Sequence, residues 1–191
     1  MAILKILTFP NPVLKSKSRH VEVFDASLRA LAADMVETMY AAPGVGLAAP
    51  QIGELVRFLV IDTRPRSETG EILMSEMSEF EKRLSWPLYL ANPEIIKSEG
   101  TFQFEEGCLS IPGYHEWVDR KKNVTVRAQN LDGEFFEFEA DGLLSVCIQH
   151  EIDHLDGRLF LDRISMVKST LLKNKIRKKG YPKHTESRNP L

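Results

Sequence analysis

The stretch DGLLSVCIQHEIDHLDG, residues 141–157, gives the strongest indication of both architecture and chemistry. It contains the pattern H-E-x-x-H, with His150 and His154 four residues apart and Glu151 directly after the first histidine. On a helix, residues four apart lie on one face, so both imidazoles can reach one metal ion with a carboxylate beside them. We therefore predict a helix that carries two metal ligands with a glutamate beside them.

The composition limits the classes of protein to which the chain can belong. The 191 residues suit one well-packed domain, and 43% hydrophobic and 27% charged residues are typical of soluble globular proteins. A net charge of −2 gives no bulk attraction to DNA or to an anionic membrane. Pro10 and Pro12 interrupt the region where a signal peptide needs an unbroken apolar stretch. With only two cysteines, we expect a cytoplasmic protein that binds neither DNA nor membranes.

Strand and helix signals along the chain indicate an α+β fold. We predict a short strand at residues 2–7 and a helix over residues 27–42, where apolar residues recur at helical spacing. Residues 64–85 are polar and predict a surface excursion between two strands, partly helical near its end. Further β-rich segments precede the H-E-x-x-H helix, which Asp141 is placed to cap and Gly157 to end.

A third metal ligand is not found downstream of the motif. A histidine six residues after His154 would complete one common zinc site, but Phe160 stands there. A glutamate on a later helix would complete another, but the only later glutamate is Glu186, in the charged tail. The missing donor is therefore expected upstream.

Two cysteines are the main upstream candidates. Cys147 lies one helical turn before His150, where a small buried core residue is the commoner role. Cys108, in EEGCLSIP, follows a glycine at an expected strand end and would complete a Cys-His-His site as a thiolate. Other possible donors lack a supporting pattern; these are His20, His115, Asp156, Asp162 and His184.

Three motifs together resemble peptide deformylase of the bacterial type, in the order of that family. They are GVGLAAPQ at 44–51, EGCLS at 106–110 and QHEIDH at 149–154. The resemblance implies an α+β fold in which antiparallel β-sheets wrap around the central helix with the histidines. It also implies a catalytic domain over residues 1–165, followed by a basic C-terminal helix and tail over residues 166–191.

The resemblance assigns a role to the motif residues. Cys108, His150 and His154 would bind one divalent metal ion, with Fe²⁺ as the expected native metal and Zn²⁺, Ni²⁺ or Co²⁺ as alternatives. Glu151 would act as general base and then acid. The Gln51 amide and the backbone N–H of Leu109 would stabilise the oxyanion.

The substrate pocket is expected beside the same helix. Leu143, Val146 and Cys147 share the helix face of His150, so an apolar wall adjoins the metal and suits a methionine side chain. The glycines of the first motif would let backbone approach the substrate closely. The resemblance implies that Val45 and Phe104 close the pocket. The full set of expected substrate contacts is then Gly44, Val45, Gly46, Phe104, Glu106, Gly107, Leu143, Val146 and Cys147.

The implied reaction is removal of the formyl group from N-formylmethionyl nascent peptides, with release of formate.

A metallopeptidase that cleaves internal amide bonds is the rival enzyme, disfavoured by the absent downstream ligand. The other rival is a ribosome- or RNA-binding protein that has lost catalysis. The tail from Lys168 to Arg188 permits it, with eight Lys or Arg against one Glu. Activity is favoured because the metal ligands, Glu151 and Gln51 are all intact. The tail is either a ribosome contact or a solvated helix end.

Overall fold

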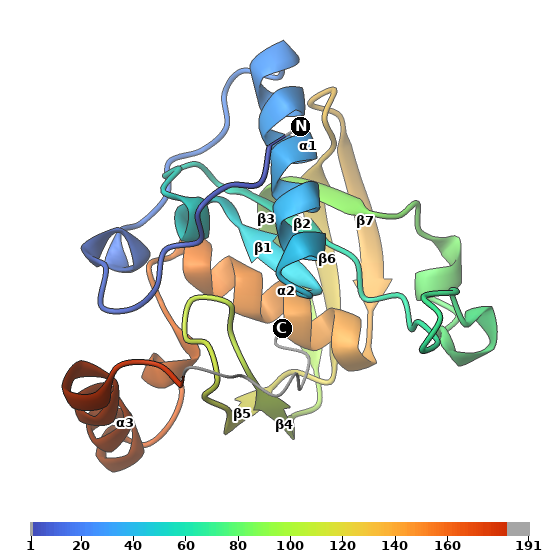
Figure 1. Ribbon diagram of the computed structural model, residues 1–191. Helices are drawn as coiled ribbons and strands as arrows, with labels where there is room; N and C mark the ends of the chain where they lie inside the picture. Colours follow the sequence, from blue (N-terminus) through green and yellow to red (C-terminus); the bar gives the residue numbers. More distant parts are fainter. Residues whose placement is uncertain (1, 183–191) are drawn as a thin grey trace.

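The protein contains a five-stranded and a two-stranded antiparallel sheet (Figure 1). The structure is a computed structural model and describes residues 2–182. The strands are β1 (Gly46–Ala48), β2 (Phe58–Ile61), β3 (Leu88–Glu99), β4 (Phe102–Glu106), β5 (Glu116–Arg120), β6 (Asn123–Gln129) and β7 (Phe135–Ala140). The larger sheet has the order β1-β2-β3-β6-β7, and β4 pairs with β5 in the smaller one. All these pairings are antiparallel, as predicted.

Three α-helices accompany the sheets. They are α1 (Ala26–Ala41), α2 (Gly142–Leu155) and α3 (Met166–Lys179). Short 3-10 helices are η1 (Pro12–Lys15), η2 (Ala49–Ile52), η3 (Met74–Glu76), η4 (Glu81–Arg83) and η5 (Phe160–Asp162). Within residues 2–182, none of the helices combines the length and the apolar character needed to cross a membrane.

Strand β2 separates α1 from α2. Leu59 and Ile61 belong to the apolar cluster that contains α2, whereas Phe58 and Val60 belong to the cluster that contains α1. Because alternate side chains of a strand point to opposite faces, the two helices pack on opposite faces of the larger sheet.

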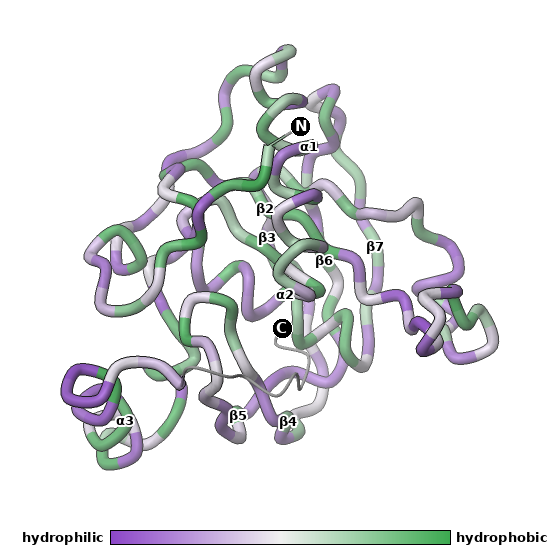
Figure 2. The backbone as a smooth tube through the Cα atoms, in the orientation of Figure 1, coloured by the Kyte–Doolittle hydropathy of each residue, from purple (hydrophilic) through white to green (hydrophobic). Residues whose placement is uncertain are grey.

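Helix α2 lies between the larger sheet and the β4–β5 pair (Figure 1). Of its 14 residues, 11 are buried, so other elements enclose the helix on nearly all sides, and six of these 11 residues are polar or charged. In Figure 2 the first half of α2 has the hydrophobic colour, whereas its second half and α3 at the periphery are largely hydrophilic. The predicted α+β fold, with antiparallel sheets around a central helix, is confirmed.

The ends of α2 follow the sequence signals in part. Asp141 occupies the N-cap position, but its side chain makes no capping hydrogen bond. Gly157 follows the helix with φ +70°, and its N–H donates to His154 O at 3.1 Å. A Cβ on Gly157 would lie 2.6 Å from Lys15 O, so glycine is required by both conformation and space.

The strand predicted at residues 2–7 does not form. The segment makes isolated hydrogen bonds to separate parts of the chain: Leu4 N–H donates to the Thr38 hydroxyl at 2.9 Å, and Leu7 N–H to Gln51 O at 2.7 Å. A strand needs a continuous ladder with one neighbour, and within residues 2–182 no such neighbour lies beside this segment. Its β-like sequence therefore yields an extended segment outside the sheets.

The polar excursion at 64–85 lies between β2 and β3 and contains η3 and η4, as predicted. Buried Glu81 fixes it, accepting hydrogen bonds from the Thr63 hydroxyl at 2.9 Å and from Ser78 N–H at 2.9 Å. The indole N–H of Trp86 donates to Glu81 O at 3.1 Å. The excursion is thus held at its base by hydrogen bonds to one glutamate.

Candidate metal centre

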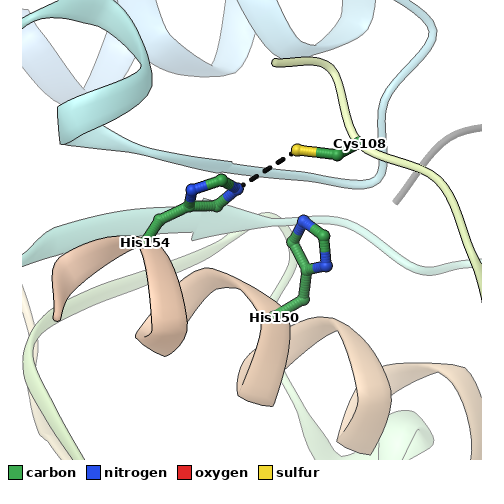
Figure 3. A group of neighbouring side chains, drawn as sticks. All are labelled: Cys108, His150 and His154. Carbon is green, nitrogen blue, oxygen red and sulfur yellow. Dashed lines mark hydrogen bonds between the residues drawn. The ribbon is translucent and has the colours of Figure 1, made fainter. Parts of the chain in front are cut away.

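Two elements bring three metal-binding side chains together in the interior (Figure 3). His150 and His154 project from one face of α2, and Cys108 approaches from the segment after β4. One potential ligand atom from each lies within 4.8 Å of the others, and all three residues are buried. The helix spacing of the histidines and the position of Cys108 after β4 therefore place the three side chains close together.

The nitrogen and sulfur atoms of this cluster suit a divalent ion. Cys108 Sγ lies 3.3 Å from His154 Nε2, and His150 Nδ1 lies 2.8 Å from Glu106 Oε2. His150 Nε2 and His154 Nδ1 are buried without a hydrogen-bond partner among the described residues. Buried polar atoms rarely remain unsatisfied, so an absent ligand is indicated. One thiolate and two imidazoles are donors that Zn²⁺ and Fe²⁺ accept.

Glu151 lies beside this cluster without a partner of its own. It is fully buried, and neither carboxylate oxygen has a hydrogen bond within the described part of the chain. Burial raises the pKa of Glu151 to about 7. A Cβ on Gly46 would lie 2.5 Å from Glu151 Oε1 and 2.6 Å from Cys147 Sγ, so the β1 backbone closely approaches this carboxylate. A carboxyl group in this state can take up and release a proton near neutral pH.

Gln51 and Leu109 flank the cluster. The side-chain oxygen of Gln51 accepts a hydrogen bond from Ala48 N–H at 2.8 Å, which fixes the amide. Its Nε2 therefore points to Cys108 Sγ at 3.8 Å and to the Ser110 hydroxyl at 3.3 Å. Leu109 directly follows Cys108, and its side chain would meet a Cβ on Gly44 at 2.7 Å. Two potential oxyanion donors are thus adjacent to the three ligands.

The expected pocket residues lie in one region. Five of them belong to the apolar cluster of α2: Val45, Phe104, Leu143, Val146 and Cys147. Gly44, Val45 and Leu143 also line an open pocket of about 510 Å³. Gly107 is buried between Glu106 and Cys108. Val146 and Cys147 precede His150 by four and three residues on α2, whereas none of the three candidate ligands lines the pocket itself.

Glu106 differs from the other expected substrate contacts because both of its oxygens are occupied. Arg120 Nε donates to Oε1 at 2.5 Å, and Arg120 Nη2 donates to Oε2 at 2.9 Å, the oxygen that His150 also contacts. Burial alone would raise the pKa of Glu106, but the hydrogen bonds from Arg120 and His150 lower it to about 2. Glu106 is therefore an ionised partner of His150, with no oxygen free for a ligand.

The charged residues behind His150 were not predicted from the sequence. Arg120 Nη1 donates to Asp153 Oδ2 at 2.7 Å, and Arg163 Nε donates to the same oxygen at 2.9 Å. Asp153 lies inside QHEIDH, but nothing in the motif indicates that it faces away from the metal ligands. No signal in the sequence marks Arg120, because its partners come from other elements.

Comparisons with known proteins identify the family of the chain. The family model described as polypeptide deformylase matches residues 3–170. The chain belongs to the polypeptide deformylase family. A peptide deformylase of Bartonella tribocorum is 45% identical over 187 residues, which cover 97% of this chain and 98% of the relative. One of Acidobacterium capsulatum is 48% identical over 178 residues, with 93% and 96% coverage.

Solved structures of deformylases agree as well. The crystal structure of a peptide deformylase from Legionella pneumophila aligns with TM-score 0.78 at 44% identity, covering 93% of this chain and 95% of that one. The Ehrlichia chaffeensis enzyme in complex with actinonin aligns with TM-score 0.81 at 37% identity, with 94% and 98% coverage. This chain is accordingly a metal-dependent deformylase, a hydrolase that removes the formyl group from the N-terminal formyl-methionine of nascent polypeptides. The metallopeptidase and the non-catalytic binding protein are thereby set aside.

Proposed function

We propose that Cys108, His150 and His154 hold the metal ion of this deformylase, and that Glu151 transfers the protons. The observation that carries the proposal is the convergence of three buried ligand atoms within 4.8 Å beside a carboxylate that has no partner among the described residues. An ion bound there supplies Lewis-acid chemistry, which polarises the formyl carbonyl and makes water more acidic.

The side chains divide the proton transfers and charge stabilisation between them. Glu151 takes a proton from the attacking water and then passes it to the leaving amine nitrogen, so formate and a free N-terminus result. As the formyl oxygen gains negative charge, Gln51 Nε2 and the backbone N–H of Leu109 donate hydrogen bonds to it. Glu106 accepts from His150 Nδ1 and so leaves Nε2 free to bind the metal.

Methionine is accommodated by the apolar wall of α2. Leu143, Val146 and Cys147 line one side, with Val45 and Phe104 in the same cluster. Gly44 and Gly46 let the β1 backbone lie close to the substrate, and β1 is the outer strand of its sheet. The buried Gly107 keeps the segment before Cys108 close to the same pocket.

The assignment of Glu151 is tested with Glu151→Gln, which preserves size and removes the base. We expect formate release from a formyl-Met peptide to fall by about 10³-fold, within the range for general acid–base groups. Metal content should stay at the wild-type level, because Glu151 is not among the proposed ligands. Glu105→Gln, at an exposed position of β4, is the matched control and should keep wild-type activity. Full activity of the Glu151 variant would refute the assignment.

We propose Fe²⁺ as the native metal, as the resemblance of the motifs to the family implies. The Cys-His-His donor set also binds Zn²⁺, Ni²⁺ and Co²⁺, and the Irving–Williams order favours zinc over ferrous iron. The test is metal analysis of protein purified without oxygen, beside protein purified in air. We expect iron and high activity in the first sample, with loss of both in the second. Zinc in the anaerobic sample with full activity would overturn the choice of iron.

We propose the ribosome as a partner of the basic segment 166–191. Support comes from the last turn of α3, where Lys178 and Lys179 form no ion pair with residues 2–182. Lys183, His184, Glu186 and Arg188 lie outside the described residues. The charge of the segment suits phosphate contacts.

Ribosome binding is tested with the double charge reversal Lys178→Glu and Lys179→Glu. Co-sedimentation with ribosomes should weaken strongly at low salt, while activity on a short peptide stays unchanged. The double variant Lys121→Glu and Lys122→Glu changes the net charge equally on another exposed surface and should bind as the wild type does. Equal binding of both double variants would exclude the segment as the contact.

We propose the cytoplasm as the place of action. Nascent formylated chains are made there, and the two free cysteines are consistent with a reducing compartment. Cell fractionation with an antibody against the chain tests this, and recovery in the membrane fraction after a salt wash would contradict it.

A further inference from the structure

A short N-terminal segment joins the two halves of the proposed oxyanion site. We name residues 7–9 the N-terminal strap. Leu7 N–H donates to Gln51 O at 2.7 Å, and Phe9 N–H donates to Ser110 O at 2.9 Å. Gln51 belongs to η2, whereas Ser110 belongs to the segment that carries Cys108 and Leu109 after β4. The strap therefore bonds to the backbone on both sides of the site.

The C-terminal part of the chain holds the strap in place. The Tyr181 hydroxyl, which follows α3, donates to Phe9 O at 2.6 Å and lies 3.4 Å from Ser110 O. Burial raises the pKa of Tyr181 to about 12, so this hydroxyl remains a donor across the physiological range. One side chain thus contacts both the strap and the segment to which the strap is bonded.

Apolar packing surrounds these hydrogen bonds. Cys108 lies in a buried cluster with Phe9 and Ile111, and Ile176 of α3 belongs to the same cluster. Leu7 and Tyr181 pack against it. Arg177 of α3 also lies over the Phe9 ring, with Cζ 5.8 Å from the ring centroid. The end of α3 is therefore packed against the strap and against the segment of Cys108.

The direct contact between the two halves of the site is weak by comparison. The Gln51 amide nitrogen lies 3.8 Å from Cys108 Sγ and 3.3 Å from the Ser110 hydroxyl, both long for hydrogen bonds that fix a geometry. The shorter bonds of the strap are the better constraint on how far the Gln51 backbone lies from the segment of Leu109. An oxyanion site depends on this spacing, because its donors act only at the correct distance.

We propose that Tyr181 is a positioning residue for deformylation: by holding the strap, its hydroxyl sets the spacing between Gln51 and the Cys108–Leu109 segment. The inference rests on the proposed role of Gln51 and Leu109 as oxyanion donors. It gives the segment after α3 a part in the reaction that is independent of any ribosome contact.

The test is a double-mutant cycle of Tyr181→Phe and Gln51→Ala in the full-length, metal-loaded chain. Tyr181→Phe removes only the hydroxyl, and we expect kcat to fall by about tenfold with little change in KM or Tm, as for a small misplacement of catalytic groups. In the Gln51→Ala background the same change should reduce kcat by less than about twofold, because the group that Tyr181 positions is already absent. Tyr89→Phe, a partly buried tyrosine in β3 whose hydroxyl makes no hydrogen bond within residues 2–182, should match the wild type.

Hydrogen exchange gives a second measurement that does not depend on activity. In Tyr181→Phe, the amide hydrogens of Leu7 and Phe9 should exchange about tenfold faster, while those of β2 and β3 keep their protection. A metal-free sample should show the same difference.

The outcomes separate the inference from the proposed function. Equal losses of kcat from Tyr181→Phe in both backgrounds, or unchanged exchange of Leu7 and Phe9, would overturn the role of Tyr181 alone. An active wild type with no effect of Gln51→Ala would instead refute the role of Gln51, and the inference with it. No formate release from the wild type would refute the proposed function of the site, and the inference with it.

Discussion

Glu106 Oε2 lies 2.8 Å from His150 Nδ1, and the same carboxylate is bound by Arg120 through two hydrogen bonds. All three side chains are almost completely buried. Arg120 also forms an ion pair with Asp153, which in turn pairs with the partly exposed Arg163. A row of alternating charges therefore extends from a proposed metal ligand to the surface and joins α2 to β4, β5 and the segment after η5.

Glu106→Gln is expected to weaken metal binding by about 10- to 100-fold, because a partner that orients a ligating histidine and increases its basicity is lost. Competition for Zn²⁺ or Co²⁺ with a chelator of known affinity measures the change. Glu105→Gln serves again as the control, one residue away but exposed. An unchanged metal affinity in Glu106→Gln would show that the carboxylate does not support His150.

Arg120→Ala should lower the free energy of unfolding by about 4 kcal/mol, because it leaves Glu106 buried without its cation. Urea unfolding of the metal-free protein measures this without a contribution from metal binding. Arg127→Ala breaks the exposed pair with Glu137 and should cost at most about 1 kcal/mol. Similar losses in the two variants would contradict the importance of the buried pair.

Gly46→Ala is expected to reduce kcat/KM by about 100-fold with a folded protein. The new methyl group would lie 2.5 Å from Glu151 Oε1 and 2.6 Å from Cys147 Sγ, so the carboxylate must move away from its position, and small displacements of catalytic groups have effects of this size. Gly70→Ala, where the added Cβ meets nothing within 4 Å, should retain activity despite its positive φ. Wild-type kinetics for Gly46→Ala would mean that the position of Glu151 is uncritical.

Asp62 should make stability depend on pH in the acid range. Burial raises its pKa, but hydrogen bonds from Arg64 and Tyr40 outweigh burial and hold the pKa below the ordinary 3.8. Because the folded-state pKa is the lower one, the stabilisation is complete above 3.8 and is lost as the pH falls through the folded-state pKa.

Asp62→Asn should accordingly cost about 2 kcal/mol at pH 7, and its difference from the wild type should shrink as the pH falls below the unfolded pKa. Urea unfolding at several pH values provides the measurement. Asp132→Asn, which breaks an exposed pair with Arg29, is the control and should show a small difference at every pH. A difference for Asp62→Asn that stays constant down to the lowest pH would contradict the lowered pKa.

The sequence predicted the parts of the protein that local spacing determines. Positions four apart on a helix place His150 and His154 together whatever the rest of the chain does, so this pair needed no tertiary information. Cys108 was identified from its motif, but its distance from the histidines depends on how β4 packs against α2. Arg120 and Asp153 were missed because a buried ion pair is defined by its partner across the fold, which no local pattern shows.

In the N-terminal segment, by contrast, the sequence predicted a strand that the structure does not contain. Residues 2–7 have a composition that favours strands, yet a strand also requires a neighbour with free hydrogen-bonding groups along its length. The groups that Leu7 and Phe9 reach belong to η2 and to the segment after β4, so extended backbone forms without a sheet. Intrinsic preference and pairing are separate conditions, and only the first can be read from the sequence.

The hydrogen bond from Tyr181 to Phe9 joins residues 172 positions apart. Phe9 is added to the growing chain early during translation, whereas Tyr181 is added 172 residues later. At about 5–20 residues per second, several seconds to half a minute separate the two events. For that interval Phe9 has no hydroxyl to hold it, and a newly made copy of the enzyme reaches its full rate only after its own translation has passed Tyr181.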